Sequence, residues 1–258
     1  MDTVGMETQV NICSIIKKEQ RYFNHWKEYH KDRGFNKIIL IIDDPDEQED
    51  YEADEYYYPP ENTGRIRQVR AYNEYMKANS GKENGWCIFV DIDEYLDFTA
   101  DDFRAFIGEN DSWSVIRLPQ VVYVADGEEY LEKYIEKPVT ERFTKISTCK
   151  KYQAGKLAVK YGAHIGFISV HEPCFGYTAP SQYSVTPVTP VDASQLQIKH
   201  FITKSKEEWD ERRLGRGDIT PGKFKDEDFY LFNEIVQDTV QLDDADEVDG
   251  EQITTDTE

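Results

Sequence analysis

The sequence predicts an α/β fold, with a mostly parallel sheet flanked by helices and a Rossmann-like first half. Apolar segments at residues 10–16 and 37–42 have the composition of buried strands. The segment between them carries large side chains at helical spacing, namely Tyr22, Trp26, Tyr29 and His30. Gly34 then provides a C-cap for that helix. A strand, a helix and a second strand in this order predict a βαβ unit, in which the two strands are parallel.

The following segments continue this alternation of helices and strands. A second helix is outlined by Ile66, Val69, Tyr72, Asn73 and Met76, and a third strand follows at residues 86–90. Shorter strands are expected at residues 114–118, 121–125, 157–160 and 165–170. We expect irregular loops at residues 46–62 and 173–190, and the second is long enough to serve as a lid.

The last part of the chain predicts two helices. Ser205 and Glu208 form a capping-box pattern, which starts a helix that runs through residue 216. The apolar side of the final helix is formed by Phe229, Phe232, Val236 and Val240.

Length and charge limit the classes of protein to which the chain belongs. Its 258 residues suit one domain, which we place at residues 1–237. The 51 acidic and 30 basic residues give a net charge of −21, which disfavours nucleic acid and anionic membrane surfaces as direct partners. Residues 238–258 contain nine acids and no lysine or arginine, a composition typical of a disordered tail.

The four cysteines and the short apolar runs indicate a cytoplasmic protein. Cys13, Cys87, Cys149 and Cys174 are widely separated and form no metal-binding pair pattern. Cys13 and Cys87 lie in strand-like apolar segments, so we expect reduced thiols in the core. The sequence shows no signal-peptide pattern and no apolar run long enough to span a bilayer.

The segment from Trp86 to Phe98 is the strongest functional signal. An apolar strand at residues 87–90 leads directly into Asp91, Asp93 and Glu94. In an open α/β sheet, ligands bind beyond the carboxyl ends of the strands, and acids there hold a divalent cation against phosphates. The alternative is that these acids only cap the following turn or helix. A bare Asp-x-Asp spacing is weak evidence, since it recurs elsewhere in this acidic chain.

Other polar residues are expected near the same edge of the sheet. Asp43 ends the neighbouring strand and suits a ribose or a base, although a simple turn before Pro45 explains it equally well. Lys17 follows the first strand and is expected near phosphates.

The closing segment, residues 200–218, combines a histidine with several cations. His200 ends an alternating apolar strand and would complete a metal site begun by Asp93. Lys204, Arg213 and Arg216 are placed to meet a diphosphate, although a helix with solvated charges accounts for them as well. His164 and His171 flank a strand at an odd separation, so at most one of them faces a site; we favour His171 as a reserve ligand.

These blocks, in this order, resemble the glycosyltransferases of family 92 and their bacterial relatives within the wider family-2-like group. The resemblance spans residues 11–218 and is carried by five blocks. The first block is Cys13, Ile15, Ile16, Lys17 and Glu19, followed by Trp26, Tyr29, His30 and Gly34. The second is the apolar strand from Ile38 into Asp43 and Asp44, then Gln68, Tyr72 and Asn73. The third is Trp86, Phe89, Asp91, Asp93, Glu94, Tyr95 and Leu96. The fourth is Glu141 to Phe143, with Lys156, His171 and Pro173. The last is His200, Phe201, Lys204, Ser205, Glu207, Glu208, Trp209, Arg216 and Gly217.

The resemblance implies a glycosyltransferase A-type (GT-A) fold and a metal-dependent glycosyltransferase with a uridine diphosphate (UDP) sugar as donor and Mn²⁺ or Mg²⁺ as cofactor. Asp91 would contact the ribose or the metal, Asp93 and His200 would ligate the metal, and Lys204 would stabilise the leaving diphosphate. Gln68 falls in the donor-binding block. The nucleotide-sugar half would span about residues 10–100 and the acceptor half about 101–237.

The resemblance also implies inversion at the anomeric carbon, for which Glu141, Glu172 and Asp126 are the candidate bases. It implies a glycan or glycoconjugate acceptor, and the acceptor would bring the protein to the membrane periphery. Residues 119–127 depart from the family pattern, which leaves acceptor identity open, and the turn Asp-Asp-Pro-Asp at residues 43–46 departs at the base-binding position.

Two other functions compete with this one. A non-catalytic sugar- or protein-binding module on the same fold is compatible with the composition. A metal-dependent phosphotransferase or phosphatase also uses an Asp-x-Asp at a strand end. That class requires Asp-x-Asp-Gly-Thr, whereas Glu94 and Tyr95 follow Asp93 here.

Overall fold

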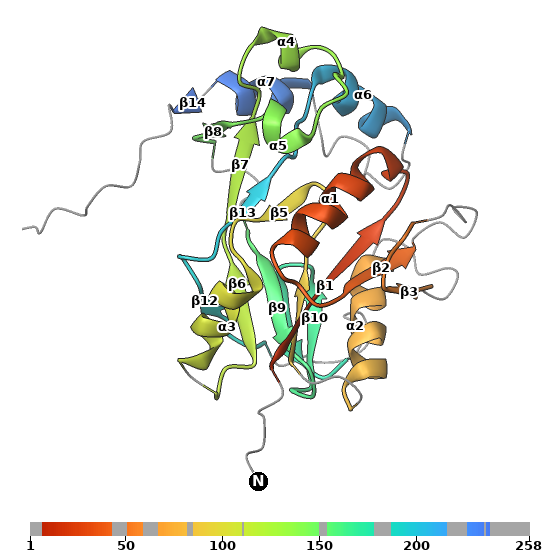
Figure 1. Cartoon of the computed structure of the whole chain (residues 1–258), viewed down its shortest axis with the longest axis vertical. Helices are drawn as coiled ribbons and strands as arrows, with labels where there is room; N and C mark the ends of the chain where they lie inside the picture. Colours follow the sequence, from red (N-terminus) through yellow and green to blue (C-terminus); the bar gives the residue numbers. More distant parts are fainter. Residues whose placement is uncertain are drawn as a thin grey trace, which may run out of the picture.

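The structure is a computed structural model, which describes residues 7–42, 51–58, 67–81, 85–109, 111–149, 154–177, 187–215, 226–234 and 236–237. Its centre is a seven-stranded sheet with the order β12-β6-β9-β4-β1-β2-β3 (Figure 1). The strands are β1 (Gln9–Ile16), β2 (Ile38–Ile42), β3 (Glu55–Tyr57), β4 (Gly85–Phe89), β6 (Val115–Leu118), β9 (Lys156–Lys160) and β12 (Val191–Asp192). All neighbouring strands are parallel except β9, which is antiparallel to both β4 and β6.

Helices cover both faces of this sheet. Successive side chains of a strand point to opposite faces, so each face carries apolar side chains that a helix buries. On one face, Ile12 and Ile88 pack with Phe23 and Trp26 of α1 (Gln20–Asp32) and with Phe103 of α3 (Ala100–Gly108). On the other face, the core includes Cys13, Ile39 and Phe89 of the sheet together with Tyr72 and Met76 of α2 (Arg67–Asn79). The predicted α/β class, with a mostly parallel sheet flanked by helices in a Rossmann-like arrangement, is confirmed.

A second sheet stands beside the carboxyl ends of the central strands. Its order is β14-β8-β7-β13-β5, and Figure 1 shows it between the central sheet and the short helices at one end of the molecule. Its strands are β5 (Glu94–Leu96), β7 (Gln120–Val124), β8 (Lys145–Ser147), β13 (Ile198–His200) and β14 (Val236–Gln237). The other elements are the hairpin of β10 (Ile165–Ser169) and β11 (Glu172–Phe175), and the helices α4 (Glu128–Leu131), α5 (Val139–Arg142), α6 (Lys206–Gly215) and α7 (Asp226–Glu234).

The strand order fixes the place where a ligand is expected. β1 pairs with β2 on one side and with β4 on the other, both in parallel. The chain therefore moves outward from β1 to β2 and β3 and then returns to the opposite side of β1. Ligands of open α/β sheets bind at such a reversal, outside the carboxyl ends of the strands.

The structure corrects three sequence expectations. Part of the segment expected to be an irregular loop at 46–62 forms β3, because it completes the sheet edge beside β2. Part of the expected loop at 173–190 forms β11, which pairs with β10. Val236, placed on the final helix by its spacing, lies in β14 opposite Ser147. α3, β5 and β8 are elements that the sequence analysis did not predict.

Several local expectations are confirmed. Gly34 follows α1 with a φ of 81°, a conformation that glycine adopts without strain. Ser205 and Glu208 form the capping box at the start of α6. All four cysteines are buried, and none of them forms a disulfide. Within the described part of the chain, none of the helices has the length and apolarity required to cross a bilayer. The expected acidic tail and Val240 lie outside the described residues.

Candidate functional site

The acids predicted from the sequence lie just beyond the carboxyl end of β4. All five residues of β4 are buried, and the chain then turns, with the Glu94 amide donating to the Asp91 carbonyl at 3.0 Å. This turn sends the chain into β5, which pairs antiparallel with β13. The register of that pair sets Glu94 opposite His200. Strand pairing therefore brings together residues that are about a hundred positions apart in the sequence.

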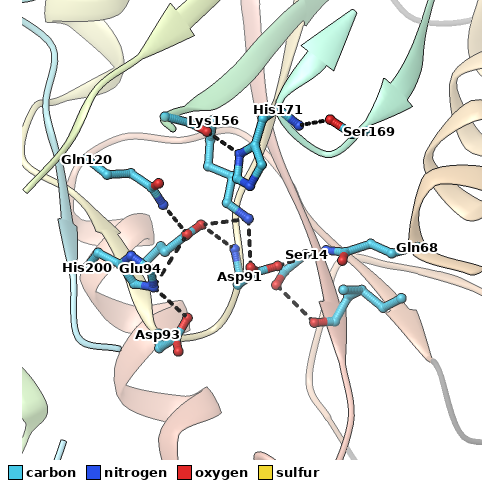
Figure 2. A network of polar contacts seen from close by, with 12 residues as sticks. Ser14, Gln68, Asp91, Asp93, Glu94, Gln120, Lys156, Ser169, His171 and His200 are labelled. Carbon is cyan, nitrogen blue, oxygen red and sulfur yellow. Dashed lines mark hydrogen bonds and ion pairs between the residues drawn. The ribbon is translucent and has the colours of Figure 1, made fainter. Parts of the chain in front are cut away.

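Asp93, Glu94 and His200 form one buried group. Each offers a ligand atom, and these atoms all lie within 4.8 Å of one another. The His200 Nε2 atom lies 3.8 Å from Asp93 Oδ1 and 3.8 Å from Glu94 Oε1 (Figure 2). Two carboxylates and one imidazole suit Mn²⁺ or Mg²⁺, with the remaining positions left to water or phosphate oxygens. The residues present thus fit the divalent cation that the sequence implies.

Burial keeps His200 neutral and favours the protonated form of Glu94. It lowers the pKa of His200 to about 4, so the imidazole is in the form that binds metals at neutral pH. Burial also raises the pKa of Glu94 to about 8, although Lys156 acts in the opposite direction. The His200 Nδ1 atom has no hydrogen-bond partner among the described residues.

Three cations surround the acids. The Lys156 Nζ atom lies 2.6 Å from Asp91 Oδ2 and 3.4 Å from Glu94 Oε2. On the other side, Lys204 Nζ lies 3.5 Å and Arg212 Nη1 2.7 Å from the same oxygen, Asp93 Oδ2. Three cations therefore face three acids, and a divalent cation at this point would compete with Lys204 and Arg212 for Asp93.

Asp91 stands apart from the Asp93–Glu94–His200 group. Its carboxylate accepts hydrogen bonds from Lys156 and, at 2.9 Å, from Gln68 Nε2 (Figure 2). Burial raises the pKa of Asp91, but the charge and hydrogen bond of Lys156 outweigh it and hold that pKa below its ordinary value. The side chain is 34% exposed, so the ionised carboxylate has a free approach from solvent. This arrangement suits a hydrogen-bond acceptor for a ligand better than a third metal ligand.

A pocket of about 200 Å³ opens beside Lys204 and Arg212. Its lining also includes Lys18, which precedes α1, and Arg21 and Tyr22 from the first turn of α1. Lys18 and Lys204 both adopt positive φ angles, 52° and 54°, which are strained for residues with a Cβ atom and are frequent at functional sites. Burial lowers the pKa of Lys204, whose Nζ atom lies 4.7 Å from the centre of the Tyr22 ring. The pocket presents cations to an anionic ligand at the edge of the acid group.

The remaining predicted residues lie in different places. Lys17 is half-buried, directly after β1. The His171 Nδ1 atom lies 2.5 Å from the Gly155 carbonyl oxygen, and Figure 2 shows His171 beside Lys156 rather than within the metal-binding group. Glu141 on α5 and Glu172 on β11 are exposed, and so is Asp126, which accepts from Thr144. Asp43 and Arg216 lie outside the described residues, and the Arg213 side chain is not among those described.

The sequence analysis named Glu94 among the strand-end acids but did not assign it as a metal ligand, and it gave no role to Lys156 or Arg212. A signal for Arg212 was present, because Glu208 and Arg212 are four residues apart and so share one side of α6. Gln120, which donates to Glu94, lies in the segment that departs from the family pattern. Lys156 was named only as a residue of the family resemblance, without a role, and nothing local indicates its partner.

Comparisons with known proteins add little beyond this geometry. A scan against protein-family models gives no match, and a search of curated proteins finds no relative. Among solved structures, S. aureus TarS (residues 1–349) aligns at 11% identity and a TM-score of 0.43, over 86% of this chain and 68% of that one. CMP:2-keto-3-deoxy-manno-octonic acid synthetase complexed with CTP aligns at 13% identity and a TM-score of 0.33, over 60% of this chain and 75% of that one. These alignments are too loose to support a functional argument, so membership of family 92 stays a prediction.

Proposed function

We propose that this protein is a metal-dependent glycosyltransferase that transfers a sugar from a UDP-sugar donor to a glycan or glycoconjugate acceptor with inversion. The observation that carries the proposal is the buried Asp93–Glu94–His200 group at the point where the strand order reverses. The family resemblance supports sugar transfer over other reactions of metal-bound nucleotides. A phosphotransferase or phosphatase of the Asp-x-Asp class would carry Gly-Thr after the motif, whereas Glu94 and Tyr95 follow Asp93 here.

Different residues around the acid group would bind different parts of the donor. Gln68 and Lys156 orient Asp91 to accept hydrogen bonds from the ribose. A bound Mn²⁺ or Mg²⁺, held by Asp93, Glu94 and His200, would neutralise the diphosphate. Lys204 and Arg212 line the adjacent pocket and are placed to bind phosphate oxygens, whose charge grows as the sugar leaves. Asp126, Glu141 and Glu172 remain the candidate bases for the acceptor hydroxyl.

The proposal predicts that the metal and UDP strengthen each other's binding. Without UDP, Lys204 and Arg212 neutralise the Asp93 carboxylate through Oδ2, while Oδ1 faces His200. Phosphates that engage these two cations would leave more of the Asp93 charge to the metal, and the coupling must be reciprocal. We expect Mn²⁺ to bind at least about tenfold more tightly with UDP present, a coupling of about 1.4 kcal/mol.

The test is calorimetric titration of UDP with Mn²⁺ and with a chelator, on wild type and on Asp93→Asn. The variant should lose the metal-dependent binding. The control is Asp97→Asn, a nearby exposed acid that pairs with Lys199 at 2.7 Å. Circular dichroism checks that each variant folds. UDP binding that is equal with Mn²⁺ and chelator, or unchanged in Asp93→Asn, would rule out the proposed metal site.

A further inference from the structure

A second cavity lies on the other side of Tyr22 from the pocket beside Arg212. Its volume is about 210 Å³, and it lies between α1 and the segment that leads through residues 134–138 into α5. Its lining includes Tyr22, His25, Tyr95, Tyr134, Glu136 and Arg142. The two cavities share Arg21 and Tyr22 as lining residues. A ligand in the second cavity would therefore lie next to one bound beside Asp93.

Tyr95 and Arg142 are fully buried members of this lining, and Tyr95 carries the hydroxyl. Its hydroxyl has no hydrogen-bond partner within the part of the chain that the structure describes. The ring itself is packed by Tyr29 and Phe201, with ring centres 4.9 and 5.2 Å away. A buried hydroxyl without a partner is costly, so a partner from outside the chain is expected to satisfy it.

The chemistry of the lining matches a sugar ring. The half-buried Tyr134 ring, with Arg21 and Arg142 5.0 and 5.3 Å from its centre, offers a surface for the C–H face of a pyranose. The Tyr95 hydroxyl and Glu136 offer hydrogen-bonding groups for the sugar hydroxyls, while His25 Nε2 contacts Thr140 at 3.1 Å. A phosphate suits the cavity less well, because the guanidinium groups are already paired. Arg142 binds Glu208 through two hydrogen bonds of 2.8 and 2.9 Å, and Arg21 binds Glu211 at 2.8 Å.

We propose that this cavity binds a sugar ring of the acceptor, with the Tyr95 hydroxyl as a hydrogen-bonding group and the Tyr134 ring as a stacking surface. The inference rests on the proposed transferase function and names the site where its acceptor binds. The proposed acceptor contact lies at α1, β5 and the segment before α5, rather than at residues 119–127.

The test is saturation-transfer difference NMR on the full chain with a panel of methyl glycosides of the common hexoses and N-acetylhexosamines. We expect transfer to at least one glycoside. Tyr95→Phe removes a single hydroxyl and should weaken that binding by roughly three- to tenfold, the effect of one lost hydrogen bond. Tyr134→Leu should weaken it as well. Tyr29→Phe is the matched control, because the Tyr29 hydroxyl also lacks a partner in the described part of the chain but Tyr29 does not line the cavity.

Thermal melting confirms that each variant folds, and binding of UDP with Mn²⁺ to wild type is measured in parallel. The absence of saturation transfer from every glycoside, or equal binding by Tyr95→Phe and wild type, would overturn the sugar site. Sugar binding that depends on Tyr95, in a protein that does not bind UDP with Mn²⁺, would support the sugar site and remove the transferase proposal. The two proposals therefore fail through different measurements.

Discussion

Replacement of Glu208 by glutamine tests the polar contact that links α6 to α5. Arg142 and the Glu208 side chain are 0% and 1% exposed, and they form two hydrogen bonds. Glu208 also accepts from Tyr22 Oη at 2.7 Å and caps α6 through Ser205. The glutamine has nearly the same shape but no charge, so Arg142 would stay buried without a counterion.

The magnitude follows from the pKa of Glu208. Burial raises this pKa, but Arg142 and Ser205 outweigh burial and lower it from 4.5 to about 2. At 1.36 kcal/mol per pKa unit, the ionised Glu208 carboxylate stabilises the folded state relative to the unfolded state by about 3.4 kcal/mol. This agrees with the roughly 3–5 kcal/mol lost when one partner of a buried ion pair is removed. We therefore expect Glu208→Gln to lower the free energy of unfolding by about 3–4 kcal/mol at pH 7.

The dependence on pH identifies the cause. A lowered folded-state pKa stabilises the protein above pH 4.5, and this stabilisation is lost as the pH falls from 4.5 towards 2. At pH 3.5 about 2 kcal/mol of this stabilisation should remain. The difference in free energy of unfolding between wild type and Glu208→Gln should therefore be about 1.4 kcal/mol smaller than at pH 7.

Urea unfolding followed by tryptophan fluorescence at the two pH values measures both quantities. Glu211→Gln on the same helix is the control. Its ion pair with Arg21 is about half exposed and should contribute at most about 1 kcal/mol. A loss below about 1 kcal/mol for Glu208→Gln, or a gap that is the same at both pH values, would refute the reasoning.

Three further predictions concern the fold and the site. Burial lowers the pKa of His30 to about 3, so His30 should contribute a loss of about 2 kcal/mol of stability as the pH falls from 7 to 5. His30→Gln should remove this contribution, so urea titrations at the two pH values should show a stability loss about 2 kcal/mol smaller in the variant than in wild type. Gly85→Ala should lower the melting temperature by at least about 4 °C, because the φ of Gly85 is 121° and an added Cβ atom would lie 2.0 Å from the Gln9 carbonyl oxygen. Gly81→Ala should melt like wild type, because its added Cβ atom would meet nothing within 4 Å. Arg212→Gln should weaken the binding of UDP in the presence of Mn²⁺ by about tenfold in calorimetry, which is the effect of one charge-assisted contact. Arg33→Gln should leave this binding unchanged, because Arg33 stacks on Tyr29 away from the pocket.

The sequence alone was sufficient for features that depend on neighbouring residues. The period of the apolar residues predicted β1, α1, β2, α2 and β4, and an apolar strand running into Asp91 and Asp93 predicted polar groups at the sheet edge. Ser205 and Glu208 predicted the start of α6, since a capping box lies within one helical turn. The same signal was available at Thr99 and Asp102, which form the capping box of the unpredicted α3.

Only the tertiary structure decided which side chains meet. The register of β5 against β13 sets Glu94 beside His200, and the antiparallel insertion of β9 places Lys156 between Asp91 and Glu94. Helix α6 brings Arg212 to Asp93, at 2.7 Å. These pairings join segments 60 to 120 positions apart. Their register depends on burying both core clusters at once, so no local pattern encodes it.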